Sequence, residues 1–91
     1  MEFEWDDAKA IANLAKHGVA FDEIHGFQWD RAFVLEDARR DYGEPRYIAS
    51  GPIGSRIHVV VFTRRSRAIR LISLRKANRR EVASYERQEK A

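Results

Sequence analysis

The stretch Arg56–Asn78 reads RIHVVVFTRRSRAIRLISLRKAN and predicts a β-hairpin that leads directly into a helix. Its two apolar runs, Ile57–Thr63 and Ala68–Leu74, are rich in the β-branched and aromatic residues that favour strands. The polar residues between them, 64–67, suit a hairpin loop. Because both faces of both runs are largely apolar, we expect this hairpin to lie at the centre of a sheet.

Cations interrupt this core-like hairpin at Arg64, Arg70, Arg75 and Lys76. A buried cation is costly unless it is paired. Strict alternation places Ser73 and Arg75 on one face of the second strand and Arg70 on the other. An arginine at the strand end, with a serine one pleat earlier, predicts an anion site, because guanidinium groups bind phosphate through two parallel hydrogen bonds. The alternative is an internal ion pair for Arg70 and Arg75, with Glu81 or Asp6 as the partner.

The remaining signals surround this hairpin with helices and two further strands. Helices are predicted over Ala8–Lys16, ended by Gly18, over Asp22–Phe27 and over Asn78–Lys90. Strands are predicted over Phe33–Leu35 and Arg46–Ser50, followed by a turn over 51–54, and Met1–Trp5 suits a short strand or an extended segment. Successive strands joined by short turns favour an antiparallel meander with its helices on one face. We therefore expect one α+β domain over residues 1–91, with about four antiparallel strands, two N-terminal helices and one C-terminal helix.

The first predicted helix has two distinct stripes. Apolar residues recur at helical spacing at Ala8, Ile11, Ala12 and Ala15, with Leu14 beside them. The opposite stripe carries Asp6, Lys9, Asn13, Lys16 and His17.

The net charge of +3 conceals a strong asymmetry between the two halves. Residues 1–45 carry five Lys or Arg against eleven Asp or Glu, a balance of −6, and residues 46–91 carry twelve against three, a balance of +9. A basic half of this density indicates a polyanionic partner, most often nucleic acid. Mutual neutralisation of the two halves within one fold is the alternative.

Several classes of function are disfavoured by composition. There is no cysteine, which excludes thiolate chemistry and suits a reducing cytoplasm. The three histidines lack metal-ligand spacing, and the chain has no glycine-rich phosphate loop, so we expect no metal and no cofactor. The acidic N-terminus is unlike a signal peptide, and the longest apolar run is too short to span a bilayer, so we expect no membrane association.

An anion site of this kind supports either phosphate binding alone or cleavage of RNA by its own 2′-hydroxyl, with cations stabilising the phosphorane. Cleavage also needs a base and a proton donor, for which His17, His58, Lys76 and Tyr85 are candidates. His17 ends a helix, where the dipole favours its charged form, and helix capping is its alternative role. For His58 the alternative is a histidine at the edge or rim of the sheet.

Two blocks of sequence resemble the BrnT-type toxins. The first has the pattern F-x-W-D-x-x-K-x-x-x-N-x-x-K-H-G-V-x-F over residues 3–21. The second is a V-x-x-T strand end at 60–63, followed by I-R-x-I-S-x-R-x-A-N-R-x-E-x-x-x-Y over 69–85. Leu74 stands where the family usually has alanine, and the arginine-rich loop replaces a commoner glycine-containing turn.

The resemblance implies a RelE-like fold and a ribonuclease toxin of a type II toxin–antitoxin pair. It also implies a ribbon-helix-helix antitoxin of the BrnA type and operator DNA bound through that antitoxin. We therefore expect a cytoplasmic, metal-independent endoribonuclease that cleaves RNA and stops translation. The expected catalytic residues are Arg75, Arg70, Arg64, His17 and His58, and the expected RNA contacts are Lys76, Tyr85, Lys9 and Arg79. The alternative function is a non-catalytic module that binds nucleic acid and antitoxin as a co-repressor.

Overall fold

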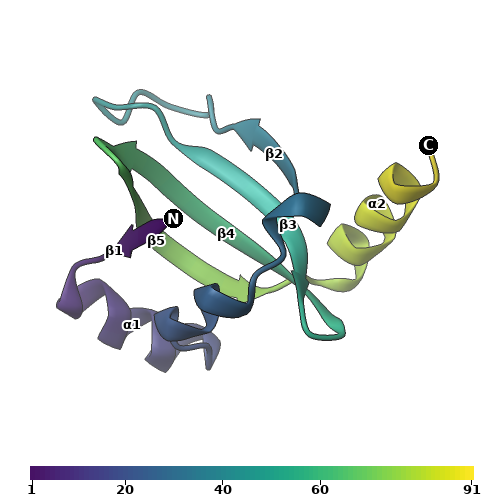
Figure 1. Cartoon of the computed structure of the whole chain (residues 1–91), viewed down its shortest axis with the longest axis horizontal. Helices are drawn as coiled ribbons and strands as arrows, with labels where there is room; N and C mark the ends of the chain where they lie inside the picture. The colour runs from purple at the N-terminus through teal and green to yellow at the C-terminus, as the bar shows by residue number, and fades with distance from the viewer.

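The computed structural model describes residues 1–91. The protein is built around one five-stranded sheet in the order β1-β5-β4-β3-β2 (Figure 1). The elements in chain order are β1 Glu2–Glu4, α1 Asp7–His17, η1 Phe21–Gly26, η2 Trp29–Arg31, β2 Phe33–Glu36, β3 Tyr47–Ile53, β4 Arg56–Arg65, β5 Ala68–Lys76 and α2 Arg79–Lys90. The α+β class is confirmed, and the predicted hairpin is β4 and β5 at the middle of the sheet.

The sheet is mixed, so the expectation of about four antiparallel strands was wrong. β1 is a fifth strand and pairs in parallel with β5, with Phe3 opposite Ile69. A three-residue strand carries little periodic signal, and its partner lies at the far end of the chain. Local patterning therefore could not assign this pairing.

The predicted turn over residues 51–54 was also wrong in its extent. Gly51, Pro52 and Ile53 continue β3, and the chain reverses only at Gly54 and Ser55. β2 begins at Phe33, opposite Ser50, and does not extend alongside Pro52, so Pro52 needs no hydrogen-bond donor toward β2. The carbonyl of Pro52 instead accepts a hydrogen bond from Gln28 N at 3.0 Å.

The end of α1 and the start of α2 lie where the sequence predicts them, whereas one predicted helix is a 3₁₀ helix. Gly18 ends α1 in the left-handed conformation at φ 71°, as expected. Asn78 begins α2 with a capping box in which the Glu81 side chain participates. The second predicted helix, Asp22–Phe27, is the 3₁₀ helix η1. The short 3₁₀ helix η2 was not predicted.

A β-bulge in β5 decides which charged residues share a face of the sheet. The pairing with β4 skips Ile72, and an extra residue of this kind reverses the alternation beyond it. Arg70, Ser73 and Arg75 therefore share the face opposite the main core, and the prediction that Arg70 lies on the other face from Arg75 was wrong. The core face of β5 carries the buried side chains of Ile69, Leu71 and Leu74.

The main core lies between this face and the segment that contains α1 and η1. Its ten buried residues are Val19, Phe21, Ile24, Phe27, Ala49, Val60, Phe62, Ile69, Leu71 and Leu74. Apolar residues at helical spacing ordinarily mark the packed face of a helix. In α1, however, Ile11 is 72% exposed and Leu14 is 51% exposed, whereas Asn13 is buried.

α2 lies at the opposite end of the molecule from α1 (Figure 1). An aromatic side chain is among the groups that anchor it. Tyr85 is buried, donates its hydroxyl proton to the Arg31 carbonyl at 2.8 Å and contacts the Phe33 ring edge-on. An exposed ion pair between Arg31 and Glu89 adds a second link. Neither α1 nor α2 has the length and apolar character that a bilayer crossing requires.

Candidate functional site

A basic cleft runs between α1 and the edge of β5. It has a volume of about 240 Å³ and is lined by Lys9, Ala12, Asn13, Lys16, His17, Ile72 and Ser73. The cleft exists because β1 is short: it covers β5 only from Ala68 to Arg70, so α1 lies against the remaining edge. The bulged residue Ile72 and its neighbour Ser73 form the strand side of the cleft, opposite the helix stripe of Lys9, Lys16 and His17.

Asn13 fixes the position of α1 against this edge. Its amide Nδ2 donates to the carbonyls of Leu74 and Val19 at 2.8 and 3.0 Å, and its Oδ1 accepts from Leu74 N at 3.1 Å. The Asn13 amide thus provides hydrogen-bond partners for the N–H and the carbonyl of Leu74, as a neighbouring strand would. Lys9 and Lys16, which lie about one helical turn to either side of Asn13, are thereby held at the cleft.

His17 is the titratable group of the cleft with a perturbed proton affinity. Burial lowers the pKa of its imidazole, and the nearby charges of Lys16 and Arg75 lower this pKa further. The direction is opposite to that expected from the helix dipole, because desolvation and two cations outweigh it. A neutral imidazole among cations can accept a proton near neutral pH.

Arg75 holds an ion pair and still keeps free donors. Its Nη1 and Nη2 donate to the two carboxylate oxygens of Glu81 at 2.7 and 2.8 Å. This hydrogen bonding raises the pKa of Arg75 and lowers the pKa of Glu81. The Arg75 side chain remains 33% exposed. A guanidinium has five N–H donors, so the pair with Glu81 orients the group and leaves donors for another anion.

The other two arginines predicted for the site, Arg70 and Arg64, make contacts that do not involve Arg75 or Glu81. Arg70 lies on the same face as Arg75 and donates to Glu4 at 2.8 Å. Both arginines therefore hold an ion pair, but only Arg75 has a predicted partner, because Glu4 is neither Glu81 nor Asp6. Arg64 is exposed toward the tip of the hairpin, with its guanidinium carbon 5.8 Å from the centre of the Tyr47 ring. None of these three arginines lines the cleft itself, and Arg75 is the one whose charge lowers the pKa of His17.

Two further predicted residues are core residues in this structure. His58 is 3% exposed, its Nδ1 lies 2.8 Å from the Arg56 carbonyl, and its buried Nε2 has no partner. Tyr85 is 2% exposed, and burial raises the pKa of its phenol. The structure therefore does not bring them to the cleft. Of the predicted RNA contacts, Lys9 lines the cleft, whereas Lys76 and Arg79 are exposed outside it.

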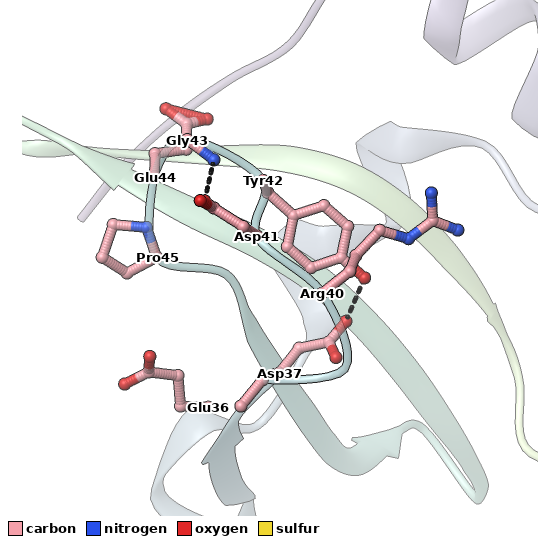
Figure 2. A pocket seen from close by; sticks show the side chains of 9 residues that line it. Glu36, Asp37, Arg40, Asp41, Tyr42, Gly43, Glu44 and Pro45 are labelled. Carbon is pink, nitrogen blue, oxygen red and sulfur yellow. Dashed lines mark hydrogen bonds between the residues drawn. The ribbon is translucent and has the colours of Figure 1, made fainter.

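A larger hollow of about 480 Å³ lies elsewhere, within the loop between β2 and β3 (Figure 2). Figure 2 shows Gly43 N donating to Asp41 and the Tyr42 hydroxyl donating to Asp37. Arg39 holds the pKa of the buried Asp37 carboxyl well below its usual range. Four carboxylates and one arginine line this hollow, so it disfavours a phosphate and we do not assign it to RNA.

Lys16 belongs to the cleft but was absent from the predicted site residues, and Ser73, which was placed in the predicted anion site, was given no catalytic or RNA-binding role. The signal was present, since Lys16 lies on the polar stripe of α1, and Ser73 lies two residues before Arg75. What the sequence could not show is that this stripe faces the edge of β5. No group of three or more His, Asp or Glu side chains is clustered so as to hold a metal ion.

Comparison with known proteins identifies one related family. The sequence model described as "Ribonuclease toxin, BrnT, of type II toxin-antitoxin system" matches residues 5–81. The match begins at Trp5 and ends at Glu81, so it contains the whole basic cleft together with the Arg75–Glu81 pair. No curated protein matches the chain.

Proposed function

Because the chain belongs to the BrnT family of ribonuclease toxins of type II toxin–antitoxin systems, we propose that it is a cytoplasmic, metal-independent endoribonuclease whose active site is the basic cleft. The observation that carries this proposal is the gathering of His17, Lys16 and Ser73 in one cleft, with the charge of Arg75 close enough to perturb His17. An imidazole with a lowered pKa beside several cations suits a reaction in which a hydroxyl must lose a proton next to a phosphate.

The proposed reaction is attack of an RNA 2′-oxygen on its adjacent phosphate. Neutral His17 accepts the 2′-hydroxyl proton while the O2′–P bond forms. Arg75 donates hydrogen bonds to the non-bridging oxygens, whose negative charge increases in the phosphorane. Lys16 donates a proton to the 5′-oxygen as the P–O5′ bond breaks. The products are a 2′,3′-cyclic phosphate and a free 5′-hydroxyl.

A cognate antitoxin follows from the type II family, and we propose that it is a ribbon-helix-helix protein of the BrnA type. In this proposal the antitoxin neutralises the toxin, and the complex binds operator DNA through the antitoxin. The acidic residues of the first half support contact with a basic protein segment, whereas Lys9, Lys16 and His17 of the same half gather at the cleft and support contact with RNA.

Incubation of the purified chain with RNA in the presence of EDTA tests the proposal. We expect cleavage to continue, with cyclic phosphate on the 5′ fragments detected by mass spectrometry. Loss of cleavage in EDTA and its recovery with Mg²⁺ would contradict the metal-independent mechanism. Retention of RNA without cleavage, weakened by salt, would instead favour the non-catalytic alternative.

The pH dependence of cleavage provides a second prediction. His17 acts as a base only when neutral, so kcat/KM should rise with pH through the pKa of His17 and then level off. Since burial and two cations lower this pKa, the plateau should begin at a lower pH than for an unperturbed histidine. His17→Ala should abolish this limb in single-turnover measurements. The exposed His25 offers a control, because His25→Ala should leave the limb in place.

A further inference from the structure

The outer face of α1 is apolar and unpartnered. Ile11 and Leu14, three residues apart, are 72% and 51% exposed, and Ala8 and Ala15 on the same face are exposed as well. The helix has its polar Asn13 toward the protein and its apolar stripe toward solvent, which reverses the usual arrangement of a surface helix. Exposed apolar residues gathered on one face of an element mark a contact surface.

This stripe borders an apolar groove of about 170 Å³. The groove is lined by Trp5, Ala10, Ile11, Leu14, Ala20, Phe21 and Asp22. Trp5 and Phe21 meet edge-on with ring centres 5.7 Å apart, and Phe21 belongs to the core, so this side of the groove is fixed by packing. Amphipathic helices bind proteins by placing their apolar face in a hydrophobic groove. Ile11 and Leu14, at positions i and i+3 beside this groove, provide an apolar surface of that kind.

The charges around the groove indicate the chemistry of the partner. Asp22 lines the groove, and Asp7 lies one helical turn before Ile11. Both lysines of α1, Lys9 and Lys16, lie at the basic cleft instead. One side of α1 therefore carries cations that suit RNA, and the other side carries an apolar stripe with acidic neighbours. Those neighbours repel a polyanion and attract a basic protein segment.

We propose that the outer face of α1 docks an amphipathic helix of the cognate antitoxin, with its apolar side chains on Ile11 and Leu14 and its Lys or Arg side chains beside Asp7 and Asp22. The proposal rests on the toxin–antitoxin pairing of the family and adds the surface and the type of segment. The docked helix lies on the back of the helix that carries Lys9 and Lys16.

The test compares two double variants that add equal charge at sites of similar exposure. Ile11→Lys/Leu14→Lys changes the outer face of α1, and Val34→Lys/Leu35→Lys changes the exposed β2 strand, where the two side chains are 52% and 58% exposed. The probe is the purified antitoxin encoded by the adjoining reading frame, titrated in fluorescence anisotropy. We expect the α1 variant to raise the Kd by at least about tenfold and the β2 variant to leave it within about twofold.

Circular dichroism checks that each variant folds, and sedimentation checks whether the chain dimerises without antitoxin. If the lysine variant does not fold, as judged by circular dichroism, Ile11→Ala/Leu14→Ala replaces it, because alanine preserves the helix. An unchanged Kd for the folded α1 variant, or a loss of affinity confined to the β2 variant, would overturn the proposal. A chain that dimerises alone through this face, shown by sedimentation and reversed by the alanine variant, would overturn it as well.

The same variants separate this inference from the proposed function. RNA cleavage is measured without antitoxin, so an inactive wild-type chain would refute the endoribonuclease while the Kd comparison remained valid. A variant at α1 that cleaves RNA normally and resists neutralisation is the expected result.

Discussion

Arg75→Ala is expected to lower the rate of RNA cleavage by about 10²–10³-fold, the usual effect of removing a donor that stabilises developing negative charge. Arg75 combines a fixed orientation, through its two hydrogen bonds to Glu81, with a side chain that is 33% exposed. Its charge also lowers the pKa of His17, so the variant should shift the pH limb of His17 upward. Single-turnover kinetics across a pH series measures both effects.

Two variants control this prediction. Arg67→Ala removes an exposed arginine from the tip of the hairpin and should leave the cleavage rate unchanged. Glu81→Gln keeps Arg75 but removes the charge that orients it, so a smaller loss of activity is expected. Normal cleavage by a folded Arg75→Ala protein would show that the pair with Glu81 is purely structural. The pair is partly exposed, so its loss should cost no more than about 1 kcal/mol of stability.

Asn13→Leu is expected to produce the largest loss of stability, about 3–5 kcal/mol, because buried polar groups left without partners cost about 1–3 kcal/mol each. The substitution leaves the Leu74 N–H and the Leu74 and Val19 carbonyls without the partners that Asn13 provides. Urea unfolding followed by circular dichroism should show a lower midpoint at an unchanged slope.

The matched control introduces the same side chain one position earlier. Ala12 is exposed, so Ala12→Leu should change the free energy of unfolding by no more than about 0.5 kcal/mol. Equal stability of the two variants would contradict the role assigned to Asn13. Asn13→Asp adds a second comparison, because it keeps the acceptor and removes both donor bonds. At neutral pH it should also be destabilised by a carboxylate beside two carbonyls, and acid should relieve part of this cost.

Features with a local signal were predicted correctly from the sequence. The central hairpin, the end of α1 at Gly18 and the start of α2 at Asn78 each depend on neighbouring residues alone. The excess of basic residues in the second half is a fact of composition, whereas the basic side chains that line the cleft, Lys9, Lys16 and His17, come from the first half. The family resemblance, carried by two separate blocks of sequence, was confirmed.

The errors share a different physical origin, because each depends on contacts between distant segments. The bulge at Ile72 reverses a strand pattern that is apolar on both faces, so no mismatch in the sequence marks it. The burial of Asn13 is favourable only because β1 leaves the edge of β5 open at Leu74. His58 was considered for proton transfer by residue type, but its place on β4 puts it inside the protein.

The short strand β1 and the Asn13 amide together have a consequence for self-assembly. At this side of the sheet the edge strand is β1, whose three residues offer little backbone for a further strand to pair with, and Asn13 occupies the backbone groups of Leu74 on the part of β5 that β1 leaves uncovered. At the other side of the sheet, β2 is an edge strand with exposed side chains from Val34 to Glu36. Growth of a fibril by strand addition needs two open edges on each molecule. A molecule with one protected edge can join a single neighbour, and chain growth then stops.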